Sequence, residues 1–293
     1  MVSPFLMCFY PKFNLHSGIK YVILILRIKM GRSSLFLACI LFFILLKGAL
    51  IVNKIEELRK IINDSDNIVF FGGAGVSVPS GIPDFRSANG IYSQKYHSVL
   101  NPEDIVSHSF FKNCPEEFYS FYKEKMIYPN AKPNAAHYAL AELERRGKLK
   151  AVITQNIDGL HQMAGSKRVF ELHGTIHYNY CMDCGKSYPL DYVIGSKGVP
   201  HCECGGIIRP DVVLYEEGLD GYTVEMSRSF VQNADVLIIG GTSLKVYPAA
   251  GYVREYMGDK LVLINKSKTD MDLSTNLVIN DDIAKVLGEA VNG

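Results

Sequence analysis

The amino-acid sequence predicts an α/β protein in which helices cover a parallel sheet and a small metal-binding module is inserted between two strands. Two observations predict the sheet: short apolar runs alternate with segments of helical periodicity, and a glycine-rich turn follows the first run. A third observation predicts the module, because four of the seven cysteines fall within residues 181–204, where the alternation is interrupted. We expect a ligand to bind at the carboxyl ends of the strands.

The order of the elements follows from the spacing of apolar residues. Apolar side chains recur at helical intervals in three segments, for which we expect helices: residues 53–63, 135–146 and 283–291. Five short apolar runs have the length and composition of buried strands: residues 67–71, 151–154, 169–172, 234–240 and 260–265. Residues 79–87 contain Pro79, Gly81 and Pro83, which exclude a regular helix and predict a rigid, irregular loop.

Composition and charge limit the functions open to the chain. Of its 293 residues, 48% are hydrophobic and 21% charged, as in ordinary globular proteins and unlike disordered ones. The formal net charge is +1. Residues 1–51 hold six Lys or Arg and no acidic residue, which leaves 25 basic and 30 acidic residues, a net charge of −5, in residues 52–293. A slightly acidic domain lacks the basic surface of a nucleic-acid-binding protein, so we expect no nucleic acid partner.

Residues 1–51 form an apolar N-terminal extension with three competing interpretations. Residues 35–46 are a run of twelve apolar residues, short of the roughly 20 that span a bilayer, and residues 35–52 would make a membrane anchor with Lys47 inside it. A signal peptide is disfavoured because no clean cleavage site follows. The third interpretation is a mis-translated leader, since codons for residues 47–49 can contain a ribosome-binding sequence ahead of a start at Val52. The protein is then cytoplasmic, with no membrane partner.

A glycine-rich turn at residues 72–77 joins the first predicted strand to a predicted helix. Glycines allow the backbone to approach a phosphate closely, and a helix N-terminus favours negative charge. The usual dinucleotide fingerprint needs a further glycine at the position of Val78, so the turn alone is also compatible with a plain strand-to-helix connection. The loop that follows adds Arg86, suited to a bidentate phosphate contact, and Phe85, suited to shielding a reactive carbon from water.

The clustered cysteines have the spacing of a structural zinc site. Two pairs, Cys181 with Cys184 and Cys202 with Cys204, are separated by seventeen residues, and four thiolates suit a closed tetrahedral zinc. His201 is a rival to Cys202 as the fourth ligand, and we favour Cys202 because thiolates are the softer ligands. A zinc–thiolate site indicates a reducing compartment.

The chain closely resembles the sirtuin family, whose motifs it carries in the same order. These motifs are GAGVSVPSGIPDFRS at 73–87, PNAAH at 133–137, TQNIDGLH at 154–161, ELHGT at 171–175, RPDVVLYEE at 209–217, GTSLKVYPAA at 241–250 and LIN at 263–265. The resemblance implies a bacterial NAD-dependent protein-lysine deacetylase in residues 52–293, with a Rossmann-like parallel sheet domain and an inserted small zinc-binding domain at about residues 175–212. NAD and zinc are the implied cofactors, and nicotinamide and O-acetyl-ADP-ribose are the implied products.

The same resemblance implies roles for individual residues. His173 would be the general base that takes a proton from a ribose hydroxyl, and Asn156 would orient water or the ribose. The residues expected to contact NAD are Gly73, Ala74, Gly75, Val78, Phe85, Arg86, Gln155, Ile157, Asp158, His173, Gly241, Thr242, Ser243, Asn265, Asp282 and Ile283. An acetylated lysine peptide or protein is the implied partner, with Val212 and Val213 beside it as an added strand.

Tyr119 and Tyr122 occupy the positions at which relatives that remove succinyl or malonyl groups carry Tyr-x-x-Arg. The arginine is missing here, so an acidic acyl group lacks its partner and we expect acetyl-lysine as substrate. Residues 215–217, Tyr-Glu-Glu, depart from the commoner Phe-Gly-Glu. Two alternatives stay open: a mono-ADP-ribosyltransferase or NAD glycohydrolase on the same fold, and a non-catalytic NAD-sensing module. The remaining histidines of the motifs are expected to be structural: His137, His161 and His177.

Overall fold

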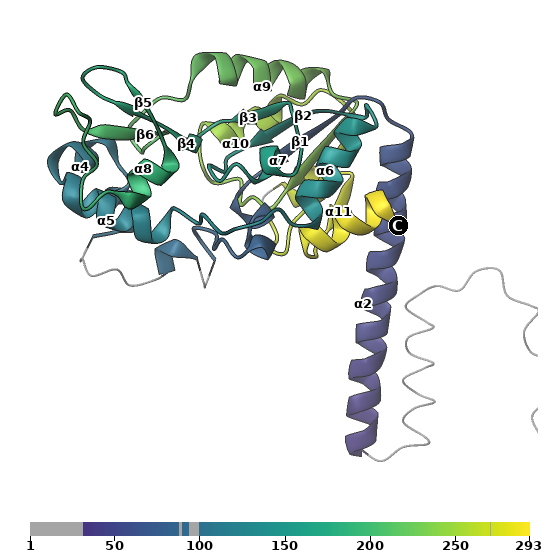
Figure 1. Cartoon of the computed structure of the whole chain (residues 1–293). Helices are drawn as coiled ribbons and strands as arrows, with labels where there is room; N and C mark the ends of the chain where they lie inside the picture. Colours follow the sequence, from purple (N-terminus) through teal and green to yellow (C-terminus); the bar gives the residue numbers. More distant parts are fainter. Residues whose placement is uncertain (1–31, 88–89, 94–99, 270) are drawn as a thin grey trace, which may run out of the picture. The chain divides into compact units, whose positions relative to one another are not determined.

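The structure, a computed structural model, describes residues 32–87, 90–93, 100–269 and 271–293, with side chains from residue 48 onward except that of Leu273 (Figure 1). The chain divides into two units, Met1–Asn53 and Lys54–Gly293. Helix α2 (Arg32–Asn63) begins in the first unit and ends in the second. The membrane anchor predicted through residues 35–52 falls largely on side chains outside the described residues. In the part of the chain that the structure describes, no helix is long and apolar enough to cross a membrane.

The second unit contains a six-stranded parallel sheet with the order β3-β2-β1-β7-β8-β9. Its strands are β1 (Ile68–Gly72), β2 (Leu149–Thr154), β3 (Val169–Glu171), β7 (Val236–Gly240), β8 (Lys260–Ile264) and β9 (Leu277–Ile279). Every residue of β1 and β7 is buried, as expected for apolar runs in a parallel sheet covered on both faces. The predicted α/β class and the five predicted strands are confirmed. Strand β9 was not predicted, because its apolar run is three residues long, between Asn276 and Asn280, whereas the predicted runs have four residues or more.

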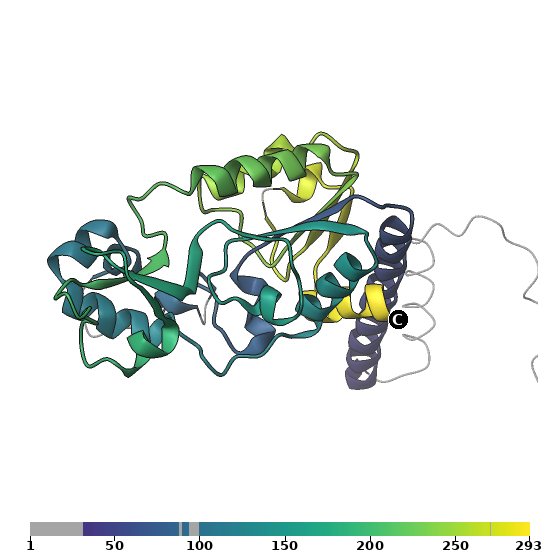
Figure 2. The same cartoon turned by 45° about the horizontal axis from the view of Figure 1, so that its top comes forward.

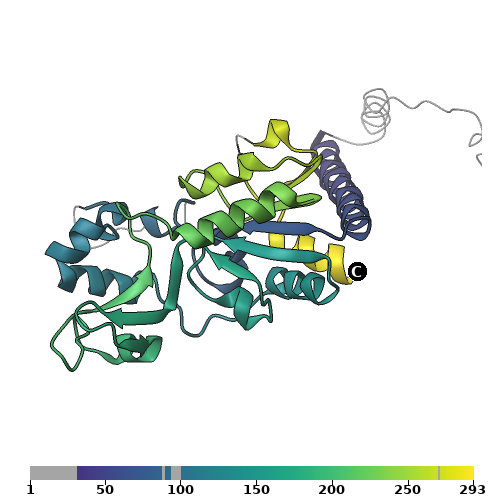
Figure 3. The same cartoon turned by 90° about the horizontal axis from the view of Figure 1, so that it is seen from above.

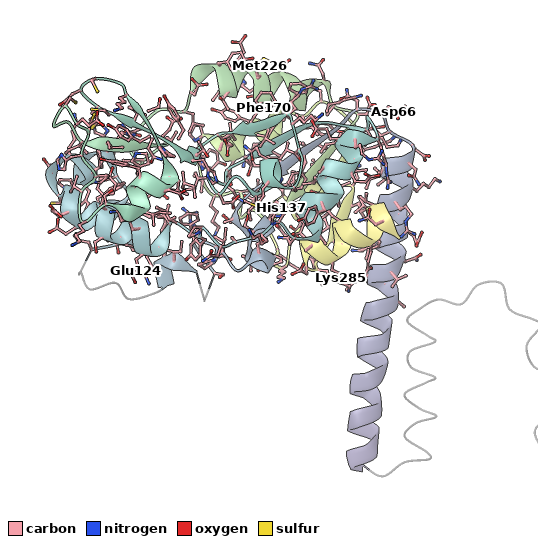
Figure 4. The ribbon with its side chains drawn as sticks, viewed as in Figure 1. Asp66, Glu124, His137, Phe170, Met226 and Lys285 are labelled. Carbon is pink, nitrogen blue, oxygen red and sulfur yellow. The ribbon has the colours of Figure 1, made fainter. Side chains whose placement is uncertain are left out.

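Helices cover both faces of this sheet (Figures 1 and 3). They are α6 (Ala135–Arg145), α7 (Leu160–Met163), α9 (Gly221–Asn233), α10 (Ala249–Tyr252) and α11 (Ile283–Asn292). Val69 and Phe71 of β1 share a core with residues of α9 and α10. Phe70 points to the opposite face, where its ring centroid lies 6.1 Å from that of His161 in α7. Phe170 of β3, labelled in Figure 4, packs on a ring of α9.

The end of α2 belongs to the sheet domain. Leu58 and Ile62 are buried, and the Nζ atom of Lys54 donates a hydrogen bond of 2.6 Å to the carbonyl oxygen of Val278 in β9. The helix predicted for residues 53–63 is therefore confirmed as the last part of a longer helix.

A second, smaller lobe is built on an antiparallel sheet of order β5-β4-β6. Its strands and following helix are β4 (Gly174–Cys181), β5 (Ser187–Pro189), α8 (Leu190–Gly195) and β6 (Ile208–Val212). An earlier part of the chain joins this lobe through α3 (Pro102–Ile105), α4 (His108–Asn113) and α5 (Pro115–Lys125). Phe111, Phe118 and Tyr119 of these helices share a core with Ile176 and Ile208 of the strands. Figure 2 shows the blue and teal helices beside the strands of the lobe.

The prediction of a helix directly after the glycine turn is wrong. Two 3-10 turns, η1 (Ala74–Val76) and η2 (Val78–Ser80), follow β1 instead. Pro79 removes a backbone donor within η2, and Gly81 takes a left-handed φ of 88°, so no α-helix propagates. A helix macrodipole therefore does not act at this turn. The other 3-10 turns of the described residues are η3 (Ile91–Ser93), η4 (Val253–Glu255) and η5 (Asp272–Ser274).

Candidate active site

The site lies where the strand order of the large sheet reverses, at the carboxyl ends of β1 and β7. From β1 the chain adds β2 and β3 on one side and later β7, β8 and β9 on the other. The connections leaving β1 and β7 therefore diverge, which opens a crevice above the sheet edge. The glycine turn follows β1, Gly241 follows β7 and Asn265 follows β8, so three segments far apart in sequence meet there.

Glycines are required where the turns after β1 and β7 touch. The backbone N–H of Gly75 donates a hydrogen bond of 2.7 Å to the carbonyl oxygen of Gly241. A Cβ atom on Gly75 would lie 2.8 Å from the Cα atom of Gly241, closer than real Cβ contacts come. Gly241 also has a φ of +60°, a left-handed conformation that residues with a side chain seldom adopt. These contacts explain the glycines of the turn as packing requirements.

A cavity of about 620 Å³ opens at this edge, within the roughly 300–1,000 Å³ typical of small-molecule sites. Most residues predicted to contact NAD line it: Ala74, Gly75, Val78, Phe85, Arg86, Gln155, Ile157, Asp158, His173, Gly241, Thr242, Ser243, Asn265 and Ile283. Asn156, Val212, Val213 and Tyr122 line it as well.

Three residues predicted to contact NAD or the acyl group lie outside the cavity lining. Gly73 lies behind it, where a Cβ atom would come within 2.9 Å of the Cβ atom of Thr242. Asp282 caps helix α11 by accepting hydrogen bonds from two backbone N–H groups, and its neighbour Asp281 lines the cavity instead. Tyr119 is buried in the small lobe, where its hydroxyl donates to the carbonyl oxygen of Ile208. The side chains of Asp282 and Tyr119 thus have structural partners within the protein, and Gly73 is required by close packing.

His173 lies in the short connection between β3 and β4. Its Nδ1 atom is 3.0 Å from the carbonyl oxygen of Gln155, which can only accept, so Nδ1 carries the proton. Burial lowers the pKa of His173 below its ordinary value of 6.5, the bond to Gln155 opposes this, and the charge of Arg86 lowers the pKa further. The imidazole is therefore neutral at pH 7, and Nε2 keeps a lone pair that can accept a proton.

A hydrogen-bonded chain of three polar side chains lines the cavity beside His173. The Nδ2 atom of Asn156 donates to Oγ of Ser77 at 3.0 Å, and Ser77 donates to Oδ2 of Asp158 at 2.6 Å. Burial raises the pKa of Asp158, against the bonds from Ser77 and the backbone N–H of Leu160. Sequence reasoning missed Ser77, because a serine inside a glycine-rich turn carries no chemical signal of its own.

Three further polar side chains of the cavity, those of Thr242, Asn265 and Gln155, are compatible with a dinucleotide. The backbone N–H of Thr242 donates to Oδ1 of Asn265 at 3.1 Å, and Nδ2 of Asn265 returns a bond of 2.7 Å to the carbonyl oxygen of Thr242. The Nε2 atom of Gln155 is a buried donor with no protein partner among the described residues. Because an unpaired buried donor is costly, a polar ligand atom beside Gln155 would stabilise it. The residues present therefore fit NAD.

The four cysteines of the small lobe fit a tetrahedral metal ion. All four Sγ atoms lie within 4.8 Å of one another, with 3.4 Å between Cys181 and Cys204 and 3.6 Å between Cys184 and Cys202. Zinc–sulfur bonds of about 2.3 Å give a tetrahedron with edges of about 3.8 Å, close to these values. His201 is turned away, since its Nδ1 atom lies 3.1 Å from the carbonyl oxygen of Gly205. The preference for Cys202 over His201 agrees with this arrangement.

The segment after β6 runs from His173 toward the small lobe. The backbone N–H of Val213 donates a bond of 3.0 Å to the carbonyl oxygen of His173. The backbone N–H of Tyr215 donates a hydrogen bond to the carbonyl oxygen of Val106, and the carbonyl oxygen of Tyr215 accepts one from the backbone N–H of His108, each at 3.0 Å. Glu216 has a φ of 75°, in the left-handed region. Glycine, the commoner residue at this position of the motif, adopts this conformation without the steric strain of a side chain. The carboxylate of Glu216 accepts a bond of 2.9 Å from the backbone N–H of Ser109.

Comparison with known proteins agrees with this geometry. The Sir2 family model matches residues 73–248. An NAD-dependent protein deacetylase of Clostridium acetobutylicum is 61% identical over 240 residues, 81% of this chain and 98% of the relative, and one of Clostridium perfringens is 61% identical over 242 residues, 82% and 99%. A Sir2 structure with p53 peptide and NAD+ has a TM-score of 0.70 and 42% identity, covering 79% of this chain and 94% of that chain. Another, with deacetylated p53 peptide and 3'-O-acetyl ADP ribose, has a TM-score of 0.74 and 40% identity, covering 81% and 97%. The chain belongs to the Sir2 family.

Proposed function

We propose that this chain removes acetyl groups from protein lysines at the expense of NAD, with nicotinamide and O-acetyl-ADP-ribose as products. The observation that carries the proposal is that a neutral His173, with Nδ1 bonded and Nε2 available, lines the same cavity as Asn156 and Asp158. The names of the similar clostridial proteins support deacetylation. They favour it over the alternative, mono-ADP-ribosyl transfer or NAD glycohydrolysis.

His173 has the properties of a general base. NAD, when bound, supplies a glycosidic bond whose cleavage releases nicotinamide and leaves an electrophilic sugar carbon. The carbonyl oxygen of Gln155 holds the proton on Nδ1 of His173, so that Nε2 is the atom that takes a proton from a ribose hydroxyl. The lowered pKa of His173 keeps this atom unprotonated at neutral pH.

The polar residues divide the cavity into two ends. Asp158 would bond the nicotinamide carboxamide, and Asn156 would orient water or the ribose; Ser77 is hydrogen-bonded to both side chains. Thr242 and Asn265 would hold the adenosine end, and their two reciprocal hydrogen bonds fix both groups before a ligand arrives.

Zinc on the four cysteines would be structural. Four thiolates fill a tetrahedral coordination sphere, so the ion has no open position for a substrate. It would tie Cys181 at the end of β4, and Cys184 in the turn after it, to the turn at Cys202 and Cys204. We place the inserted zinc-binding domain at about residues 175–212 on this basis.

An acetylated lysine peptide is the proposed partner, and Val212 and Val213 are proposed to lie beside it. Tyr122 is 1% exposed and lines the cavity in place of an arginine. Burial raises the pKa of Tyr122, so its side chain stays uncharged and offers no counter-charge to a succinyl carboxylate. Peptides carrying acetyl-lysine should therefore have a higher kcat/KM than the same peptides carrying succinyl-lysine, and the reverse order would contradict the assignment.

The proposal is tested with His173→Ala and an acetylated peptide. The variant should bind NAD with nearly the affinity of the unchanged protein, measured by calorimetry, and should produce no O-acetyl-ADP-ribose, measured by mass spectrometry. A variant that still deacetylates the peptide would overturn the role of His173. Product analysis of the unchanged protein separates the alternative, which would release ADP-ribose and leave the acetyl group on lysine.

We also propose that residues 52–293 are the catalytic unit and that residues 1–51 are a mis-translated leader, which makes the protein cytoplasmic. The similar clostridial proteins are matched over 98% and 99% of their own lengths by 81% and 82% of this chain. The intact mass of the protein from its native cell tests this proposal. A mass that includes residues 1–51 would refute it and revive the anchor through residues 35–52.

A further inference from the structure

The guanidinium of Arg86 is engaged by two acceptors of the protein. Its Nη2 atom donates to Oε1 of Glu103 and to the hydroxyl of Tyr215, both at 3.1 Å. The ring of Tyr92 lies beside the same group, 5.4 Å from the guanidinium carbon. Arg86, Tyr92 and Tyr215 all line the cavity. The side chain proposed to meet the dinucleotide phosphates is therefore engaged by groups of the protein itself.

Both hydrogen bonds are donated by the same nitrogen of Arg86, Nη2. An arginine binds a phosphate in bidentate fashion through a pair of nitrogens, either Nε with Nη2 or Nη1 with Nη2. Both pairs include Nη2, which has two hydrogens and already donates to Glu103 and Tyr215. A phosphate can therefore take both prongs of either pair only after one of these acceptors has been displaced.

The hydroxyl of Tyr215 is the centre of this cluster. It lies 3.1 Å from Nη2 of Arg86, 3.2 Å from the hydroxyl of Tyr92 and 3.3 Å from Oε1 of Glu103. A hydroxyl has one hydrogen and two lone pairs, so Tyr215 donates to the carboxylate and accepts from Arg86 and Tyr92. Burial and this hydrogen bond raise the pKa of Tyr92, which keeps its donating proton in place. Every hydrogen-bonding position of the Tyr215 hydroxyl is thus used.

The acceptors belong to a different part of the fold from Arg86. Glu103 lies on α3, and the backbone of Tyr215 bonds Val106 and His108 in the segment that follows α3. The turn that carries Arg86 is closed by its own bonds, from Ile91 N–H to Asp84 O at 2.7 Å and from Tyr92 N–H to Phe85 O at 2.9 Å. The cluster therefore adds polar contacts between two segments that already pack together, since Phe85 and Tyr92 lie against a small core that includes Ile91, Ile105 and Val106.

We propose that Glu103 and Tyr215 compete with the dinucleotide phosphates for Arg86 and thereby set the affinity of the site for dinucleotide. This inference rests on the proposed phosphate contact of Arg86. The competition is weak enough for a ligand to win, since the side chains of Arg86 and Glu103 are 31% and 48% exposed. Ion pairs with that exposure stabilise little and are screened by salt. A phosphate that arrives while Glu103 stays in place also meets a like charge.

The test is the dissociation constant of NAD, measured by calorimetry on the full chain without peptide. Glu103→Gln removes the competing charge and should tighten binding about twofold to fivefold, the range set by a partly exposed ion pair. Tyr215→Phe removes only the hydroxyl and should tighten binding by about twofold. Matched controls are Glu225→Gln and Tyr222→Phe, on the exposed side of α9, which should bind like the unchanged protein.

Two further measurements identify the phosphates and Arg86 as the groups involved. ADP-ribose, which keeps the phosphates, should show the same fold-changes as NAD, whereas adenosine should bind all variants equally. Arg86→Ala should weaken NAD binding, and adding Glu103→Gln to it should then have no effect. Unchanged or weaker NAD binding by Glu103→Gln, with Arg86→Ala still weakened, would overturn the competition. If Arg86→Ala binds NAD like the unchanged protein, the proposed phosphate contact fails and the competition fails with it.

Discussion

Two buried histidines should make the folded protein unstable in mild acid. His137 of α6 and His161 of α7 have ring centroids 4.7 Å apart, and both are at most 1% exposed. Burial lowers the pKa of His137 to about 4, and burial together with the neighbouring His137 lowers the pKa of His161 to about 3. His137 is labelled in Figure 4, among the side chains below the sheet. Neither ring nitrogen of His161 has a hydrogen-bond partner among the described residues.

The sign and size of the effect follow from these pKa values. A histidine whose pKa is depressed in the folded state takes up its proton more readily when unfolded, so acid favours unfolding. The stability from the neutral rings is complete above pH 6.5, the ordinary value, and is lost as the pH falls toward about 4 and 3. Between pH 8 and pH 5 the loss is roughly 2 kcal/mol for each histidine, because at pH 5 the unfolded ring is protonated and the folded ring is not. Any folded pKa well below 5 gives the same figure.

The assay is urea unfolding of the full chain at several pH values between 5 and 8, compared with His161→Leu. The leucine variant removes one of the two proton-binding rings, so its loss of stability between pH 8 and pH 5 should be smaller by roughly 2 kcal/mol. His137 is left in place because its Nδ1 atom accepts a bond of 3.2 Å from the backbone N–H of Asn134. Tyr138→Phe, exposed on the same helix, is the control and should keep the full pH dependence. An identical pH dependence in His161→Leu and the unchanged protein would refute the reasoning.

Three further predictions concern the site and the metal. The pH profile of kcat/KM should be flat above neutrality and fall only below pH 6.5, because the lowered pKa of His173 keeps the base unprotonated until then; a fall beginning near pH 8 would contradict this. Gly241→Ala should lower the free energy of unfolding by about 1–3 kcal/mol and weaken NAD binding. The reason is that its Cβ atom would lie 2.4 Å from the backbone nitrogen of Val76, at a φ of +60°. Urea unfolding measures the first effect and calorimetry the second. Removing zinc with a chelator should unfold the small lobe and abolish deacetylation, followed by zinc content, near-UV circular dichroism and activity, and a metal-free protein with full activity would exclude a structural ion.

Local patterns in the sequence predicted those parts of the fold that depend on neighbouring residues. Five of the six strands of the large sheet were predicted as short apolar runs, because central strands that are buried on both faces have a nearly continuous apolar sequence. The zinc site was predicted because the two cysteines of each pair are close in sequence, and cysteine pairs at this spacing are typical of zinc ligands. The roles of His173 and of the residues expected to contact NAD were predicted from the family resemblance, since a single histidine has no sequence pattern that identifies its role.

The remaining features depend on contacts between distant residues. Ser77 bonds Asp158, 81 positions away, and Arg86 bonds Tyr215, 129 positions away, and no periodicity links either pair. The packing of α4 and α5 on the small sheet was missed for the same reason. The helix predicted after the glycine turn is absent because Pro79 removes a backbone donor within η2 and Gly81, at a left-handed φ, ends η2 after three residues.

The position of His173 connects the catalytic proposal to the stability of both lobes. It lies between β3 of the large sheet and β4 of the small one, and its ring bonds Gln155 of the large domain while its carbonyl accepts from Val213 after β6. Gly174, the next residue, has no room for a side chain, since a Cβ atom would lie 2.0 Å from the carbonyl oxygen of Asp211. A change that shifts β4 or β6 is therefore expected to displace the backbone of His173 relative to Gln155, whose own backbone N–H is bonded to the carbonyl oxygen of Gly72 at the end of β1. For this reason the zinc cysteines, which act on β4 from its far end, should affect the rate through the placement of the base without touching the substrate.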